Sequence, residues 1–134
     1  MEKMAIIVRD DAYDKVLTPL AFAYLAAASN IEVSMLFVNW AVRYLGKGFE
    51  IAPCSHPGTD EWLASQVAKA GLPPDPREII KALKATGKVH LYACSLASQI
   101  FGVDEHNLIP EADGIIGATW FLLEKANGVH TQYF

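Results

Sequence analysis

Cysteine is scarce in this chain, since only Cys54 and Cys94 occur among its 134 residues. Two thiols cannot form the disulfide framework that stabilises many small secreted domains. They also fall short of a closed zinc site, because the paired Cys and His motifs that supply four ligands are missing. We therefore expect reduced thiols, a cytoplasmic location and no bound metal.

Positive charge is also scarce, because 11 Lys and Arg against 15 Asp and Glu give a net charge of −4. Proteins that bind nucleic acid use basic faces that release counterions from phosphate, so nucleic acid is not an expected partner. Charged residues make up 19% of the chain and hydrophobic residues 52%, which excludes a disordered protein. This high apolar content in a small chain favours self-association.

No long apolar run is present either. The longest uncharged stretch, residues 16–31, contains Pro19 and is shorter than the roughly 20 residues needed to cross a bilayer. The N-terminal Met-Glu-Lys leads directly into a strand-like run without a signal-peptide pattern. We therefore expect no membrane association, and a length typical of one domain predicts a single unit over residues 1–134.

Short apolar runs alternate with helical patterns along the chain. Strands are expected at residues 4–8, 31–38, 89–93, 114–118 and 129–134. Helices are expected at residues 16–29, around 62–67, from 75 to 87, from 94 to 102 and at 119–126. This alternation predicts an α/β fold with a mainly parallel sheet of about five strands and helices on both faces.

Several local patterns predict how the helices begin. Pro19 should lie in the first turn of the 16–29 helix, because an interior proline breaks a helix. Asn39 is a possible cap for a helical turn after the second strand. Residues 75–78, Asp-Pro-Arg-Glu, form a capping-box pattern with proline at the first helical position. The 16–29 helix is apolar nearly all round, which favours burial by its sheet on one side and by a partner subunit on the other.

Residues 46–74 are the least regular part of the chain, with several Gly and Pro residues, and we expect them to form a lid or an interface arm. Cys54 lies there in the sequence Cys54-Ser55-His56 and is expected to be an exposed loop cysteine. Two alternatives are a second thiol that reaches Cys94 and part of a metal site with His56.

Ligands of open α/β sheets bind beyond the carboxyl ends of the strands. The residues expected there are Arg9, Asp10 and Asp11, then Asn39 and Trp40, and finally Cys94 and Ser95. Only Cys94 is a strong nucleophile. At a strand-to-helix turn its thiol would face unpaired N–H groups of the helix start, which stabilise a thiolate. The alternative is a small buried residue without a chemical role.

No general base for Cys94 lies nearby in the sequence. His90 is about 13 Å away along the strand, toward the other end. Tyr92 lies on the same face at about 6–7 Å, but a phenol is not a base at neutral pH. A Cys-His acyl-transfer enzyme is therefore poorly supported, whereas a thiol that accepts and passes on a sulfur atom needs no dedicated base.

Other motifs for cofactors and cations are weak. Gly46-Lys47-Gly48 is too short for a phosphate loop, and no dinucleotide-binding motif follows the first strand, so no cofactor is expected. Asp10, Asp11 and Asp14 could bind a cation, but capping of the following helix is the simpler interpretation.

The segments VHLYACSLASQIFGV and GIIGATWFLLEKA, with MAIIVRDDAYDKVLTPLAFAYLAAA and IEVSMLFVNWAV at the start, resemble the DsrE/DsrF-like sulfur-relay family. The similarity leaves residues 46–71 unmatched. It implies a three-layer α/β/α fold and homo-oligomers, often trimers or hexamers. It also implies a persulfide on Cys94 and, as partners, TusA-like or rhodanese-type sulfur carrier proteins.

The sequence therefore predicts a sulfur carrier, or a sulfurtransferase-like protein, that holds sulfane sulfur as a persulfide or thiosulfonate on Cys94. Tyr92, Ser95 and Asn39 are predicted to line the site, with Cys54 as a possible secondary thiol. Two alternatives stay open: an oligomeric scaffold whose Cys94 is inert, and a redox protein that uses both thiols. Exposure of Cys94 favours the carrier over the scaffold, and close approach of the two sulfur atoms favours the redox protein.

Overall fold

The computed structural model describes residues 1–134 and contains a five-stranded sheet in the order β4-β3-β2-β1-β5. The strands are β1 (Lys3–Val8), β2 (Glu32–Phe37), β3 (Val89–Cys94), β4 (Gly114–Ile116) and β5 (His130–Tyr133). Every pair of neighbouring strands is parallel. The central strand β2 is buried along nearly all of its length, as expected for an apolar strand that is covered on both faces.

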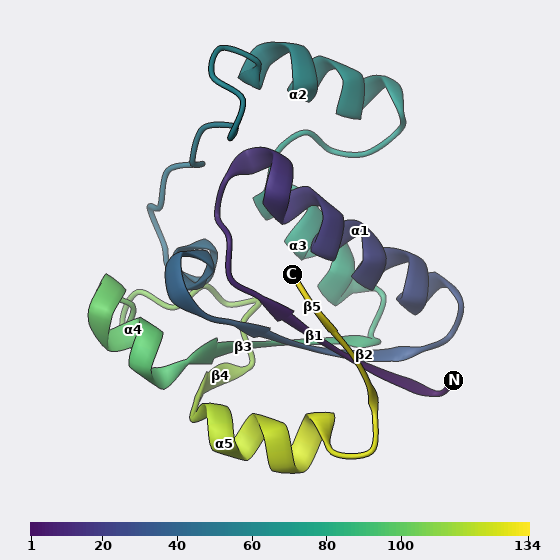
Figure 1. The fold of residues 1–134 in the computed structure, drawn as a ribbon, viewed down its shortest axis with the longest axis vertical. Helices are drawn as coiled ribbons and strands as arrows, with labels where there is room; N and C mark the ends of the chain where they lie inside the picture. The colour runs from purple at the N-terminus through teal and green to yellow at the C-terminus, as the bar shows by residue number, and fades with distance from the viewer.

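Helices cover both faces of this sheet (Figure 1). On one face α1 (Tyr13–Ala28) packs against α3 (Pro76–Ala85), and on the other lie α5 (Ala118–Phe121) and its π-helical continuation η2 (Leu122–Ala126). The short helix α4 (Ser95–Phe101) follows β3 at the edge of the sheet. This three-layer α/β/α arrangement confirms the predicted fold class. No helix is both long enough and apolar enough to cross a bilayer.

The first helix begins earlier than predicted. Because α1 starts at Tyr13, Pro19 lies in its interior and not in its first turn, so that prediction is wrong. Pro19 has no N–H to donate to the carbonyl group of Lys15, which leaves one helical hydrogen bond unmade. The helix continues because the side chains on its inner face, among them Val16 and Leu20, are fully buried against the sheet.

The outer face of α1 is open. Phe22, Tyr24 and Leu25 are 43%, 39% and 63% exposed, and no charged residue follows Lys15 in this helix. Phe22 also packs edge-on against Phe134 at the C-terminus, with ring centroids 5.2 Å apart. The helix is thus buried by its own chain on one side only.

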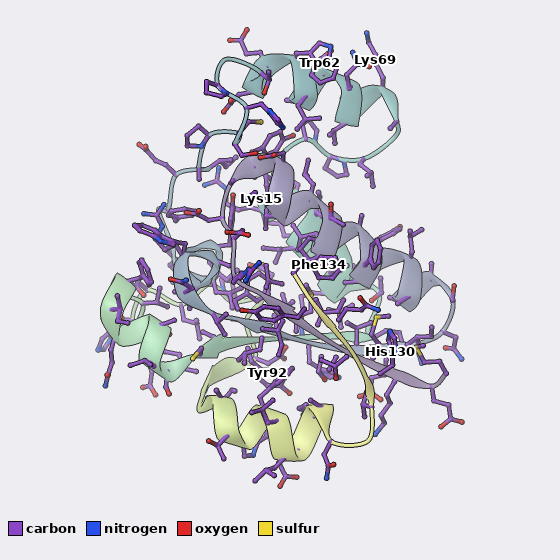
Figure 2. All side chains as sticks on the ribbon, in the orientation of Figure 1. Lys15, Trp62, Lys69, Tyr92, His130 and Phe134 are labelled. Atoms are coloured by element: carbon purple, nitrogen blue, oxygen red, sulfur yellow. The ribbon has the colours of Figure 1, made fainter.

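Between β2 and α3 the chain forms the 3-10 helix η1 (Asn39–Leu45) and then an irregular segment that contains α2 (Asp60–Lys69). The helix predicted around residues 62–67 is present, but α2 buries none of its residues and lies at one end of the molecule, where Figure 2 labels Trp62 and Lys69. The start of α3 is as predicted, since Asp75 is its N-cap and accepts a hydrogen bond from the Arg77 amide at 2.8 Å.

Candidate functional site

Cys94 is the last residue of β3 and the N-cap of α4. On one side, the strand register places Cys94 opposite Ile116 of β4. On the other side, Phe37 at the end of β2 pairs with Ala93, so Cys94 lies one residue beyond the end of β2. Its dihedral angles are extended (φ −65°, ψ 128°), so the turn into α4 occurs immediately after it. The thiol therefore belongs to the carboxyl edge of the sheet, where sites of α/β proteins gather.

Two helices begin next to this thiol. No side chain caps α4, and α5, which starts just beyond the Cys94–Ile116 pair, is also uncapped. Unpaired N–H groups at a helix start carry partial positive charge and stabilise an anion such as a thiolate. Cys94 is therefore bordered by the starts of two helices, whereas the sequence predicted only the start of α4.

The thiol is nevertheless well covered. Cys94 is 7% exposed and packs in the hydrophobic core, and Ser95 beside it is half-buried. Tyr92 lies on the same face of β3 and points between the sheet and α5 (Figure 2), where its ring centroid is 5.5 Å from that of Trp120. Cys94 therefore faces the α5 side of the sheet, and a reagent reaches its sulfur only through a small opening or a local movement.

Asn39 is exposed at the tip of β2, the strand next to Cys94, but it does not cap a helix. It makes no side-chain capping bond, and its φ of 52° places it in the left-handed region, which Asn tolerates better than most residues. The predicted capping role is wrong. The following Trp40 packs against Phe101 of α4 with ring centroids 4.7 Å apart, so η1 and α4 are joined at this edge.

The aspartates that follow β1 also have unexpected partners. Asp11 pairs with Arg43 of η1 at 3.0 Å, and Asp14 accepts hydrogen bonds from Ser55. Burial opposes ionisation of Asp14, but the hydrogen bonds from Ser55 outweigh it and lower the pKa of this carboxyl group. The N-cap of α1 is Ala12, so the predicted capping of this helix by an aspartate is wrong. No group of three or more His, Cys, Asp or Glu side chains is arranged to hold a metal ion.

Cys54 is 7% exposed, so the prediction of an exposed loop cysteine is wrong. Its amide donates to the Asp60 carboxylate at 3.2 Å, and the carbonyl group of Pro53 accepts a hydrogen bond from the amide of Tyr13. These bonds hold the loop against the first turn of α1, on the sheet face opposite to that of Cys94. The Cys54 loop lies near the end of β1, which leads into α1, whereas Cys94 is at the end of β3. Because β2 lies between β1 and β3, the ends of these two strands are about 10 Å apart. Both thiols are free, and the structure does not bring them together.

Two basic side chains lie along β3. His90, at the far end of this strand, pairs with Glu32 of β2 at 3.2 Å and is not at the thiol, as the sequence indicated. Lys125 of η2 lies over the rings of Tyr92 and Trp120, at 5.9 and 5.7 Å from their centroids. No pattern near Cys94 in the sequence points to Lys125, because Lys125 reaches Tyr92 only where α5 and η2 cross this face of the sheet, from the β4 edge toward the β5 edge.

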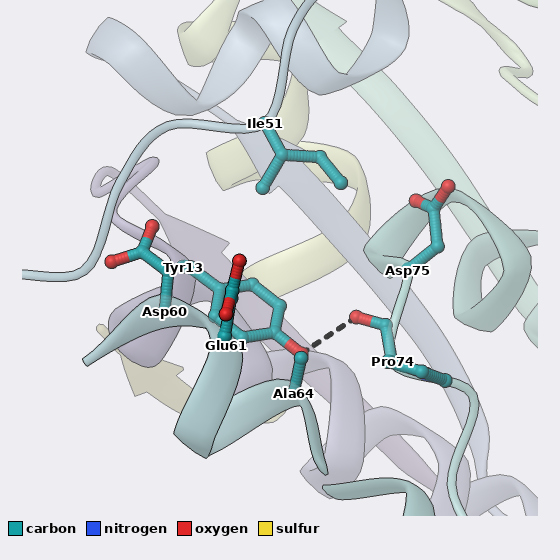
Figure 3. A pocket seen from close by; sticks show the side chains of 7 residues that line it. All are labelled: Tyr13, Ile51, Asp60, Glu61, Ala64, Pro74 and Asp75. Carbon is teal, nitrogen blue, oxygen red and sulfur yellow. Dashed lines mark hydrogen bonds between the residues drawn. The ribbon is translucent and has the colours of Figure 1, made fainter. Parts of the chain in front are cut away.

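A cavity of about 420 Å³ lies beneath α2, and none of the residues predicted for the Cys94 site lines it. Its walls, shown in Figure 3, are Tyr13, Ile51, Asp60, Glu61, Ala64, Pro74 and Asp75. The Tyr13 hydroxyl donates to the Pro74 carbonyl at 2.7 Å. Burial, followed by the nearby charges of Cys54, Asp75 and Asp60, raises the pKa of Tyr13. This hollow is therefore separate from Cys94.

Known proteins share this fold. A model of the DsrE/DsrF-like family matches residues 2–125. The ychN protein from E. coli is 18% identical over 100% of both chains, with a TM-score of 0.64. A protein of unknown function from Methanobacterium thermoautotrophicum, MTH1491, is 13% identical over 100% of both chains, with a TM-score of 0.63. A conserved protein of unknown function from Bacteroides thetaiotaomicron, BT1422, is 13% identical over 99% of this chain and 95% of its own, with a TM-score of 0.65. At these identities the likeness shows the fold alone, and no curated protein sequence matches the chain significantly.

Proposed function

This chain belongs to the DsrE/DsrF-like family, a family of sulfur-relay type, and from that premise we propose that it carries sulfane sulfur on Cys94. The observation that carries the proposal is the position of this thiol. Cys94 ends a central strand at the carboxyl edge of the sheet and is bordered by the uncapped starts of α4 and α5. No other cysteine of the chain has such surroundings.

The proposed chemistry is an exchange between sulfur atoms. The Cys94 thiolate attacks the outer sulfur of a donor persulfide, and a bond forms between Sγ and that sulfur. The sulfur–sulfur bond of the donor breaks, and its electron pair leaves on the donor thiolate. The step needs no external oxidant or reductant, and the same exchange in reverse passes the sulfur to an acceptor thiolate. The N–H groups of the two helix starts stabilise the anionic forms of Cys94 before and after loading.

Transfer between proteins requires a docking surface beside Cys94. On α4, which begins at this residue, Leu96 and Ile100 are 65% and 67% exposed, and the helix carries no charge. Exposed apolar side chains of this kind are typical of protein contacts. We propose TusA-like or rhodanese-type carrier proteins as the donor and acceptor, and a trimer or hexamer of this chain as the working assembly.

A second function is favoured by one specific observation, the burial of Cys94. At 7% exposure within the core cluster, the residue also suits a purely structural role. The chain would then be an oligomeric scaffold or binding module with an inert thiol. The redox alternative gains no support, because Cys54 and Cys94 are free and lie on opposite faces of the sheet.

Sulfur loading of the native protein separates these functions. After incubation with thiosulfate, tetrathionate or a persulfide donor, the intact mass of the wild type should rise by one sulfur atom or one thiosulfonate group. Dithiothreitol should remove the adduct. The nearly isosteric Cys94→Ser variant should keep the native far-ultraviolet circular dichroism and gain nothing. If native Cys94 resists alkylation and acquires no sulfur, the scaffold function replaces the carrier.

A further inference from the structure

A polar cleft, separate from the hollow beneath α2, lies at the far end of α4 from Cys94. It has a volume of about 260 Å³, and its lining includes Arg43 and Lys47 but no Asp or Glu side chain. The whole chain carries a net charge of −4, so a cleft lined by two basic residues and no acidic residue is unusual for this protein. None of the residues proposed for sulfur transfer lines this cleft.

Arg43 is held in a fixed position at this cleft. One guanidinium nitrogen, Nη2, donates to Asp11 at 3.0 Å, and the group lies over the rings of Phe49 and Trp40, at 4.0 and 5.1 Å from their centroids. Its Nε is buried without an acceptor. The salt bridge therefore uses only part of the donor capacity of the guanidinium group, which has five N–H donors.

Lys47 and its loop supply further donors. The side chain of Lys47 is exposed, and its ammonium group has no ion-pair partner. The Lys47 amide donates to the carbonyl group of Asn107, whereas the amides of Gly48 and Phe49 donate no backbone hydrogen bond. Gly48 has a φ of 75°, and successive N–H groups in such a turn commonly form a concave site for an anion.

Asp11 is the one carboxylate that pairs with a cation of this cleft, and it leaves the Lys47 ammonium group unpaired. Asp104 accepts hydrogen bonds from the amides of His106 and Asn107, at 2.8 and 3.0 Å, so its carboxylate is engaged within its own turn. We infer that the cleft binds a small divalent oxyanion of the sulfate, thiosulfate or phosphate class. Arg43, Lys47 and the amides of Gly48 and Phe49 supply its hydrogen bonds.

This site is distinct from the reactive thiol. Gly102, which lines the cleft, lies eight positions after Cys94 in the sequence, and at a rise of 1.5 Å per helical residue this is about 12 Å. An anion in the cleft therefore does not touch the Cys94 sulfur. The inference goes beyond sulfur transfer, and the Cys94→Ser variant should bind the anion as well as the wild type does.

Titration of the ¹⁵N-labelled chain with sodium sulfate, phosphate and thiosulfate tests the inference, with sodium chloride holding the ionic strength constant. All three anions should bind saturably and shift the amide signals of Gly48 and Phe49 most. Lys47→Ala should weaken binding about tenfold, because one charge-assisted hydrogen bond is lost. Lys69→Ala, which removes an exposed lysine on α2, should bind as the wild type does.

The order of the three affinities identifies the source of the anion. Tightest binding of thiosulfate indicates a small sulfur compound, and tightest binding of phosphate indicates a phosphorylated one. Equal shifts with sodium chloride alone overturn the inference. Unchanged affinity in a Lys47→Ala variant whose other amide signals are native also overturns it.

Discussion

Cys94 and Cys54 are equally exposed, at 7% each, but their surroundings differ. Cys94 ends a strand where two helices begin without side-chain caps, and an anion there is stabilised by free N–H groups. Cys54 lies in a loop that its own amide ties to Asp60. Position in the fold, and not exposure, therefore distinguishes the two thiols and makes Cys94 the proposed sulfur carrier.

Replacing Cys54 should leave sulfur loading intact. In Cys54→Ser, we expect the same mass gain on Cys94 as in the wild type, because Cys54 lies on the opposite sheet face and is not joined to Cys94. Intact-mass measurement after equal exposure to the donor checks this, with Cys94→Ser as the matched control. A loss of loading in Cys54→Ser as complete as in Cys94→Ser would replace the single carrier by a relay of two cysteines.

Residue roles were predictable from sequence where they depend on adjacent residues. The cap at Asp75 was found because Asp followed by Pro is a local signal for a helix start. The sequence wrongly predicts Asp11 as a cap, because the partner of Asp11 is Arg43, which lies 32 residues away in the sequence. The burial of Cys54 was missed for the same reason, since it depends on contact with α1 and with Asp60.

Among the elements, α3 is the helix whose start depends most clearly on a single side chain. The Asp75 carboxylate accepts a hydrogen bond from the Arg77 amide and pairs with the Arg77 guanidinium group at 3.2 Å. Asp75→Ala should therefore lower the free energy of unfolding by about 1 kcal/mol at neutral pH. Urea unfolding, with the midpoint and slope compared to those of the wild type, measures this loss.

The effect of Asp75→Ala should depend on pH. Burial alone raises the pKa of Asp75, but its hydrogen bonds and charge pairing with Arg77 outweigh burial and lower the pKa. A carboxyl group with a lowered pKa stabilises the fold above its unfolded-state pKa of about 3.9, and this contribution disappears as the pH falls through the folded-state pKa. The difference between Asp75→Ala and the wild type should therefore shrink between about pH 5 and about pH 3.

Glu105→Ala is the control for this series, because Glu105 is exposed and has no ion-pair partner. It should change the free energy of unfolding little at any pH. A loss in Asp75→Ala that stays constant down to about pH 3 would contradict the charged cap.

Most element boundaries followed from the sequence. The predicted strands and the last helix agree with the structure to within two residues at each end. The start of α1 was the exception. The helix begins at Tyr13 and continues past Pro19, because the buried contacts that stabilise it come from the sheet and not from the helix sequence.

At the scale of the molecule, several apolar side chains remain open to solvent on separate elements. Among them are Leu25 on α1, Leu96 on α4 and Leu123 on η2, at 63%, 65% and 63% exposure. Apolar surface of this extent in a small chain favours association with further subunits. We propose that α1, which has three large exposed apolar side chains, forms the main contact between copies of the chain.

Leu25→Glu should dissociate the proposed homo-oligomer, because a carboxylate buried in an apolar contact loses its hydration without gaining a partner. Sedimentation velocity at micromolar concentration should show an assembly for the wild type and a smaller species for the variant. Lys69→Glu, which introduces a carboxylate at an exposed position on α2, should leave the assembly intact. A monomeric wild type would contradict the proposal.

The layered architecture was predictable because alternating strands and helices leave few arrangements of a parallel sheet. The strand order was not predicted. β5 joins the sheet beside β1, at the edge opposite β4, because α5 and η2 carry the chain across one face. No local pattern specifies that path, and it also explains why Trp120 and Lys125, which contact Tyr92, were not assigned to the site.

The most direct test of sulfur transfer follows one labelled sulfur atom through the protein. The native chain is loaded from a persulfide whose outer sulfur is isotopically labelled, then digested without reductant, and the peptides are analysed by mass spectrometry. Without an acceptor, the account predicts the label on the peptide that contains Cys94. When an acceptor thiol is added before digestion, the account predicts that the label leaves Cys94 and is found on the acceptor. Absence of the label from Cys94, or its presence on Cys54 instead, would contradict the account.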